Sequence, residues 1–109
     1  MSNVRLVQMK FQPEKKQVWL DWCEQLKNRS EEVIETLKSE GVRTEACFLS
    51  EDGNSIFYFM EVSDLEKEKA AVESSTFQID KDHREARLQS LERGHVLTTL
   101  FFFENRDSK

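Results

Sequence analysis

The sequence predicts an α+β fold, in which helices pack on one face of a four-stranded antiparallel sheet. Three observations support this prediction: a stretch that reads as a central strand, a helical period over residues 14–40, and a length of 109 residues. In Ser55–Val62, large apolar side chains occupy both faces of the predicted strand. This pattern is typical of a strand in the middle of a sheet that is covered on both sides. A chain of this length forms one modest core, so we expect a single domain over residues 1–109.

The first half of the chain predicts a strand followed by a long helical segment. Residues 4–11 alternate as a strand, and Pro13 suits the first turn of a helix. Over residues 14–40 the apolar residues lie on one helical arc, which includes Trp19, Trp22 and Leu26. One continuous helix would be about 40 Å long, against about 27 Å for an eight-residue strand. The helix therefore either breaks near residues 28–30, where Asn28 and Glu31 have capping-box spacing, or overhangs the sheet.

The second half predicts three strands and two helices. Residues 44–50 form a strand, and the turn residues 52–54 join it to the central strand as a hairpin. Capping boxes at Ser63 and Ser75 start a helix over about 64–73 and a second helix that runs to Arg93, where Gly94 stops it. Residues 96–104 are apolar on both sides and predict the last strand.

The order strand, helix, strand, strand, helix pair, strand predicts two interleaved right-handed crossovers, which is a ferredoxin-like topology. The helices would cover one face of the sheet, while the second, third and fourth strands place large apolar side chains on the other. Uncovered apolar surface of this size is adhesive in water, and an identical chain is always available to cover it. We therefore expect a homodimer that forms through the open sheet face.

The layout resembles the dimeric α/β-barrel superfamily and, more specifically, a family of small uncharacterised bacterial proteins within it. The similarity rests on residues 32–37 before Gly41, on Ser55–Val62, and on residues 75–83 with Ile79 and Asp80. It implies a dimer with a small-ligand cavity, in a superfamily that includes cofactor-free monooxygenases, sugar mutarotases and lactone isomerases. The layout is also similar to L-rhamnose mutarotase. That family uses a His and aromatic hydroxyls in its sugar site, but the helical segment here has neither, so none of its catalytic residues is carried over.

His83 is the first candidate for acid/base chemistry. It lies three residues after Asp80 on a predicted helix, where the carboxylate could orient the imidazole; alternatively, both are solvated side chains. Arg84 could bind an oxyanion or simply pack its stem and extend its head into water. Glu61, an acid within the central strand, could act as a base or pair with Arg84 or Arg5.

Aromatic and sulfur-containing residues have two interpretations each. Trp19 and Trp22 could line the mouth of a ligand pocket or could be core and interface anchors. His95 follows Gly94, where a helix-capping role is expected. Cys23 and Cys47 lack metal-site spacing and suit small core residues in a reducing compartment.

Composition excludes several functional classes. The net charge is -5, so nucleic acid is not an expected partner. No apolar run approaches the ~20 residues of a membrane span, and no signal peptide is evident, so we expect a cytoplasmic protein without a membrane partner. Phosphate loops, nucleophile elbows and metal-ligand clusters are missing from the sequence, so we expect no metal and no cofactor.

These observations leave two functional hypotheses. The first is cofactor-free proton transfer on a small polar molecule, of the mutarotase or isomerase kind, with His83, Asp80 and Glu61 as catalytic candidates. Arg84, Trp22 and Trp19 would then bind the ligand. The second is a non-catalytic small-ligand binding or regulatory module, and the sequence leaves open whether the protein is an enzyme.

Overall fold

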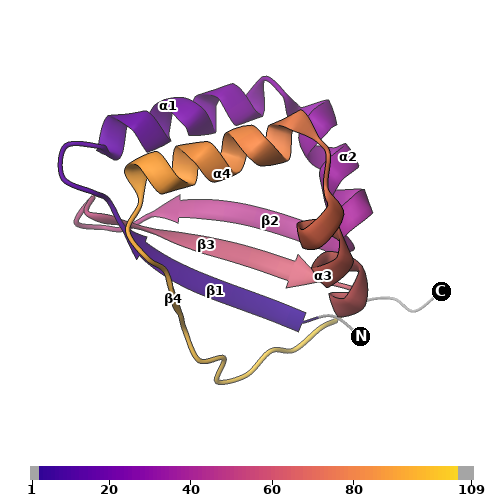
Figure 1. Ribbon diagram of the computed structural model, residues 1–109. Helices are drawn as coiled ribbons and strands as arrows, with labels where there is room; N and C mark the ends of the chain where they lie inside the picture. The colour runs from indigo at the N-terminus through magenta and orange to yellow at the C-terminus, as the bar shows by residue number, and fades with distance from the viewer. Residues whose placement is uncertain (1–2, 106–109) are drawn as a thin grey trace.

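The computed structural model describes residues 3–105. Its elements are β1 (Asn3–Lys10), α1 (Lys16–Lys27), α2 (Ser30–Glu40), β2 (Val42–Leu49), β3 (Ser55–Val62), α3 (Leu65–Ser74), α4 (Gln78–Ser90) and β4 (His95–Val96). All neighbouring strands are antiparallel, in the order β2-β3-β1-β4. The helices lie on one side of this sheet (Figure 1). The predicted ferredoxin-like α+β fold is confirmed.

The long helical segment is broken near residues 28–30, which is the first of the two predicted outcomes. α1 ends at Lys27 and α2 begins at Ser30, but the predicted capping box is wrong, because the Asn28 side-chain amide donates back to the Glu24 carbonyl. Arg29, at the break, pairs with Asp82 on α4 at 2.9 Å and places its guanidinium 5.8 Å from the centre of the Trp22 ring. Arg29 therefore links the end of α1 to α4 through these two contacts.

Two of the predicted caps are replaced by other contacts. The Asp64 carboxylate, instead of the Ser63 hydroxyl, accepts the Lys67 backbone N–H at the start of α3. The Ser75 hydroxyl donates to Asp80, and α4 begins after Phe77 without a side-chain cap. Gly41 ends α2 in the left-handed conformation, which glycine adopts without steric cost.

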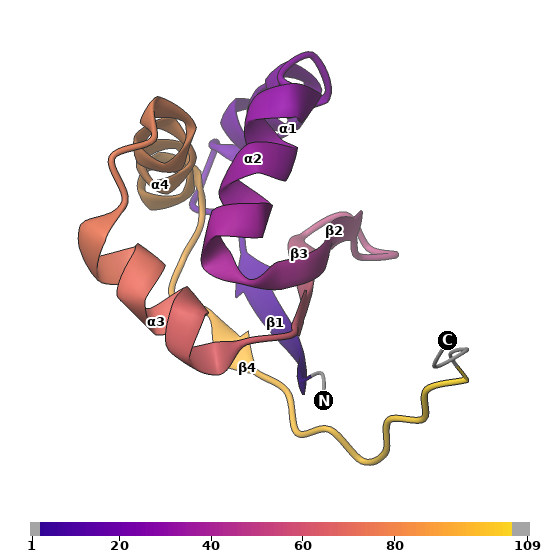
Figure 2. The same ribbon diagram turned by 90° about the vertical axis from the view of Figure 1, so that its right-hand side faces the viewer.

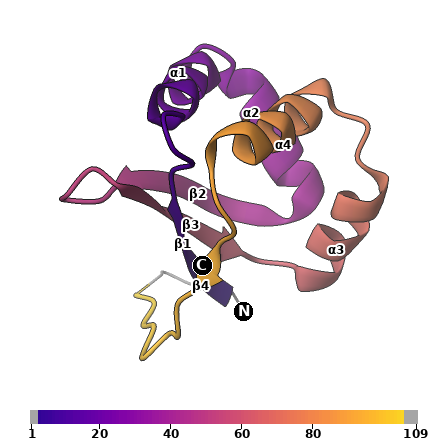
Figure 3. The same cartoon turned by 60° about the vertical axis from the view of Figure 1, so that its left-hand side comes forward.

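The predicted last strand over 96–104 is wrong for most of its length. Only His95 and Val96 pair with β1 as a strand, and the Leu97 N–H then donates to the Leu6 carbonyl at 2.8 Å. After this contact the chain leaves the sheet and extends away from it (Figures 2 and 3). The apolar residues of this segment are therefore uncovered within the described chain.

The core lies between the helices and the sheet. Its buried members come from β1, α1, β3, α4 and the residue after α4, and they are Met9, Trp19, Trp22, Ile56, Ile79 and Leu91. Because side chains alternate along a strand, Ile56 and Tyr58 face the helices and Phe57 and Phe59 face the open side. Across residues 3–105, no helix combines the length and apolar character that a membrane span requires.

Candidate functional site

A cavity of about 330 Å³ lies between α1, the first half of α2, and the strands β2 and β3. Its apolar wall includes Leu26, Val33 and Ile34 from the helices. The residues with polar groups that line it are Trp19, Glu45, Tyr58, Lys27 and Ser30, together with the thiol-bearing Cys23 and Cys47. Few polar groups in a mainly apolar hollow is the usual form of a small-molecule site.

His83 lies directly behind this cavity, and both of its ring nitrogens have partners. The Trp22 indole N–H donates to Nδ1 at 2.9 Å, and the Tyr58 hydroxyl lies 3.2 Å from Nε2. An indole N–H is only a donor, so Nδ1 accepts, and the proton of the neutral ring is on Nε2, facing the Tyr58 oxygen. The Tyr58 proton is then free to point at another acceptor, and the Glu45 carboxylate interacts with this hydroxyl.

Three aromatic rings surround the imidazole of His83. The ring centres of Trp19, Trp22 and Tyr58 lie 5.7, 6.0 and 5.8 Å from its centre. Burial in this shell and, to a lesser extent, the charge of Arg87 lower the pKa of His83 to about 4, while the charge of Asp80 opposes the shift. The imidazole is consequently neutral at neutral pH, in agreement with the hydrogen-bond directions.

Glu45 is the carboxyl group that reaches the cavity. Burial raises its pKa, the interaction with Tyr58 lowers it, and the charge of Asp80 raises it. Glu40, at the end of α2, has its pKa raised to about 7 by burial and by the nearby charges of Asp80, Glu45 and Glu68. A carboxyl with a raised pKa beside a cavity has the properties of a general base.

The indole N–H of Trp19 is the other notable polar group of the cavity. Trp19 is 1% exposed, and its Nε1 has no hydrogen-bond partner of normal geometry among residues 3–105. The indole interacts with the Cys47 thiol closely enough to lower the thiol pKa, although the contact with the neighbouring Cys23 raises it more. A buried donor without a partner carries a free-energy cost.

The two cysteines meet at the cavity and both are free thiols. Their side chains interact, and this contact is the main reason why the pKa of Cys23 is lowered. Within the described part of the chain, no cluster of three or more His, Cys, Asp or Glu side chains could hold a metal ion.

The structure gives His83 and its predicted helix neighbours different surroundings from those expected. His83 points inward, but its nitrogens bind Trp22 and Tyr58, so the expected contact with Asp80 is replaced. Asp80 instead accepts the Thr36 hydroxyl at 2.8 Å and the Ser75 hydroxyl. Arg84 is exposed on α4.

The structure agrees only in part with what the sequence predicts for Glu61 and the two tryptophans. Glu61 and Tyr58 are on opposite faces of β3, so the expected convergence of His83, Glu61 and Arg84 on one site does not occur. Glu61 is buried and accepts the Thr44 hydroxyl at 3.0 Å, and Arg5 pairs with Glu68 at 2.9 Å. Both tryptophans are core residues; Trp19 also lines the cavity, while Trp22 holds His83.

Sequence reasoning missed Glu45 and Tyr58. The hairpin register pairs Cys47 with Tyr58 and Glu45 with Met60, which puts Glu45 and Tyr58 on the face that packs against the helices. The turn at residues 52–54 was the available signal, because a hairpin turn sets the register of the strands that it joins.

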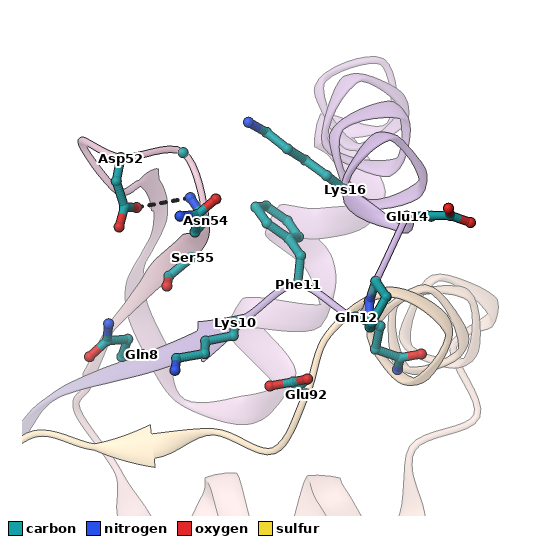
Figure 4. A pocket seen from close by; sticks show the side chains of 12 residues that line it. Gln8, Lys10, Phe11, Gln12, Glu14, Lys16, Asp52, Asn54, Ser55 and Glu92 are labelled. Atoms are coloured by element: carbon teal, nitrogen blue, oxygen red, sulfur yellow. Dashed lines mark hydrogen bonds between the residues drawn. The ribbon is translucent and has the colours of Figure 1, made fainter.

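A second hollow, of about 600 Å³, lies between the β1–α1 connection and the β2–β3 hairpin (Figure 4). Its charged side chains, which include Lys10, Lys16 and Glu92, are exposed. Asp52 is already engaged, because it accepts the Ser50 hydroxyl at 2.7 Å and the Asn54 N–H at 2.9 Å. Exposed charges in water are poorly suited to proton transfer, so the smaller cavity is the candidate site.

Solved structures show the same fold at low sequence identity. A protein of Bacteroides thetaiotaomicron, provisionally described as an antibiotic biosynthesis monooxygenase, is 16% identical with a TM-score of 0.67, over 99% of this chain and 96% of that one. A conserved protein of Methanosarcina mazei Go1 is 18% identical with a TM-score of 0.60, over 89% of each chain. A protein of Nitrosomonas europaea with the same provisional description as the first is 10% identical with a TM-score of 0.60, over 92% and 91%.

These similarities establish the ferredoxin-like fold and give no particular support to the likeness to L-rhamnose mutarotase. Among curated proteins, none matches the chain significantly. A family model does match, over residues 2–107, which is nearly the whole sequence. The chain therefore belongs to the DUF6176 family, a family of unknown function.

Proposed function

We propose that the cavity binds a small organic molecule with a carbonyl or similar oxygen and that Glu45 moves a proton on it without a cofactor. The observation that supports this most directly is the pair of hydrogen bonds that joins Trp22 to His83 and His83 to Tyr58, whose hydroxyl interacts with the Glu45 carboxyl group in the cavity. Because the ring proton of His83 is on Nε2, the Tyr58 oxygen accepts it, and the Tyr58 proton is available to the Glu45 carboxylate.

The proposed step balances within the ligand. The Glu45 carboxylate takes a proton from a carbon next to the ligand carbonyl, and the electron pair of that bond moves to the carbonyl oxygen. The Trp19 N–H, which has no hydrogen-bond partner of normal geometry among residues 3–105, would donate to this oxygen and stabilise its negative charge once the bound ligand displaces the side chains that cover the donor. Return of the proton from Glu45 to the other face of the same carbon gives an epimer. Where the ligand has a C=C bond next to that carbon, return of the proton to the far end of that bond gives a positional isomer, and in neither case is another reactant consumed. His83 is a positioning residue in this scheme, because it does not line the cavity.

The subunit with this site is proposed to be one half of a cytosolic homodimer, as the sequence predicts. Sugars remain within the proposed substrate class, since their open-chain forms carry a carbonyl next to a C–H bond. Two structural neighbours are provisionally described as monooxygenases, so oxygenation of a bound ligand is the alternative reaction for this cavity.

Hydrogen–deuterium exchange in a panel of small ketones, aldehydes and sugars, followed by NMR in D₂O, tests the proposal. We expect catalysed exchange at the carbon next to the carbonyl, reduced at least about 100-fold in Glu45→Gln. Glu51→Gln, at the exposed hairpin turn, is the matched control and should retain the full rate. Binding of a ligand should also shift the Trp19 indole N–H resonance.

Three results would contradict the proposal. The first is ligand binding without exchange, which would favour the binding-module hypothesis. The second is an equal rate in Glu45→Gln and in the unchanged protein. The third is oxygen uptake with the same ligands, which would assign oxygenation instead of isomerisation.

A further inference from the structure

The chain after β4 carries a row of large apolar side chains that the described residues leave uncovered. Leu100, Phe101 and Phe103 are 90%, 75% and 84% exposed, and the segment runs clear of the sheet in Figure 2. Phe102, between them, is 39% exposed and is therefore better covered by its own subunit than Phe101 and Phe103 are. Side chains of this kind gain free energy when they leave water, so a covering surface is expected.

The sheet edge of the same subunit cannot pair with these phenylalanines in the observed register. β4 pairs with β1 as Val7 with Val96 and Gln8 with His95. Continued along β1, this register brings Leu100 opposite Asn3, the first residue of β1, and Phe101 to Phe103 fall beyond the described strand. The covering surface must therefore lie elsewhere.

The open face of the sheet is an apolar surface that also needs covering. All four helices lie on the other face of the described sheet (Figure 1). Phe57 and Phe59 point to the open face and pair across the strands with Phe48 and Ala46 on one side and with Gln8 and Leu6 on the other. Phe48 and Leu97 are exposed. Residues 3–105 thus contain both an apolar segment and an apolar sheet face, and no other described element packs over either of them.

We propose that residues 97–105 form an arm that packs on the open sheet face of a second copy of this chain. A two-fold axis makes the exchange reciprocal, so each copy both gives and receives an arm. Apolar side chains occupy both faces of the extended arm, so the arm fits between two sheets that face each other. Phe102 would then point toward its own subunit, and Phe101 and Phe103 toward the partner.

The area involved is sufficient for a stable dimer. A fully buried aromatic side chain hides about 150–250 Å², so Phe101 and Phe103 account for about 300–500 Å² per arm, to which Leu100 and the exposed part of Phe102 add. A standard specific interface buries about 800 Å² per partner, which one arm together with the sheet face would reach. The arm exchange rests on the proposed homodimer and is independent of the chemistry in the cavity, which lies on the other side of the sheet.

Light scattering of the full chain after size-exclusion chromatography tests the assembly. We expect twice the subunit mass of 12.9 kDa. Phe101→Ser with Phe103→Ser should weaken the dimer at least about 100-fold in dissociation constant. Val72→Ser with Leu88→Ser, which removes two exposed apolar residues from the helices, should leave the dimer unchanged.

Isotope-filtered NOE spectra of a dimer mixed from labelled and unlabelled chains test the arm itself. We expect contacts between the rings of Phe101 and Phe103 in one chain and Phe48 in the other. Arm contacts confined to a single chain, a monomeric unchanged protein, or equal masses for the arm variant and the control variant would each overturn the proposal. Because none of these readouts uses a ligand, they are separate from any failure of the proposed chemistry.

Discussion

The indole N–H of Trp22 donates to Nδ1 of His83 at 2.9 Å, and this contact determines how the imidazole can be used. An acid/base histidine must exchange a proton at one of its nitrogens. Here Nδ1 cannot take a proton without losing the Trp22 hydrogen bond, and Nε2 is engaged with Tyr58. His83 is therefore suited to orient Tyr58, and the proposed proton chemistry is assigned to the carboxyl group of Glu45.

The first prediction concerns the protonation of His83. Nitrogen-15 NMR should show the neutral Nε2–H tautomer near pH 7 and a titration midpoint near the lowered pKa of about 4, against the ordinary value of 6.5. Trp22→Phe should raise the His83 pKa, because protonation at Nδ1 then breaks no hydrogen bond. A midpoint near the ordinary value in the unchanged protein would show that the imidazole is not held in this way.

The second prediction concerns the pH dependence of stability through Glu40. Its folded pKa of about 7 lies above the ordinary 4.5, so the folded chain binds more protons than the unfolded chain between these values. Stability from this group is present below the ordinary pKa and is lost as pH rises through about 7. Glu40→Gln should therefore gain stability over the unchanged protein at about pH 8, on the order of 1 kcal/mol after allowance for solvent screening, and little at about pH 5.

Urea unfolding at the two pH values measures the Glu40 effect. Glu35→Gln, an exposed position on the same helix, is the control and should change little at either pH. An equal effect of Glu40→Gln at both pH values would contradict the raised pKa.

The third prediction concerns the relative reactivity of the two thiols. The pKa of Cys23 is lowered and that of Cys47 is raised, and alkylation requires the thiolate. Cys23 should react with iodoacetamide at least about tenfold faster near pH 8, as followed by peptide mass spectrometry. Exposure alone predicts the opposite order, because Cys47 is exposed and Cys23 is half-buried. Faster labelling of Cys47 would therefore contradict the pKa assignment.

Much of the fold could be predicted because its signals are local. The two-sided apolar pattern of Ser55–Val62 and the length mismatch in the first helical segment both depend on neighbouring residues in the chain. The last strand could not be predicted in the same way. Its apolar pattern is strand-like, but the described subunit offers no surface for it beyond Leu97.

The site was harder to predict because its contacts join distant parts of the chain. His83 was selected for its spacing from Asp80, yet Thr36 and Ser75 occupy that carboxylate. The true partners of His83 come from α1 and β3, and only the packing of α4 brings them together. Helical spacing shows which side chains can meet on one helix, whereas competition from other elements decides which do.

The last prediction concerns Gly41, which ends α2 and packs against the residues that precede α3. Its φ of +69° is left-handed, and a Cβ there would lie 3.0 Å from both the Cβ and the carbonyl oxygen of Asp64. The Gly41 carbonyl also accepts the Ser63 N–H at 2.8 Å, so the backbone cannot shift freely. Gly53, with φ of +75°, has a similar conformation, but a Cβ there meets only the flexible end of Lys16. Gly53→Ala should cost about 1 kcal/mol of unfolding free energy, and Gly41→Ala roughly 2–3 kcal/mol. Chemical denaturation of both variants measures the difference, and equal costs would show that contact with Asp64 adds nothing to the strain of the backbone.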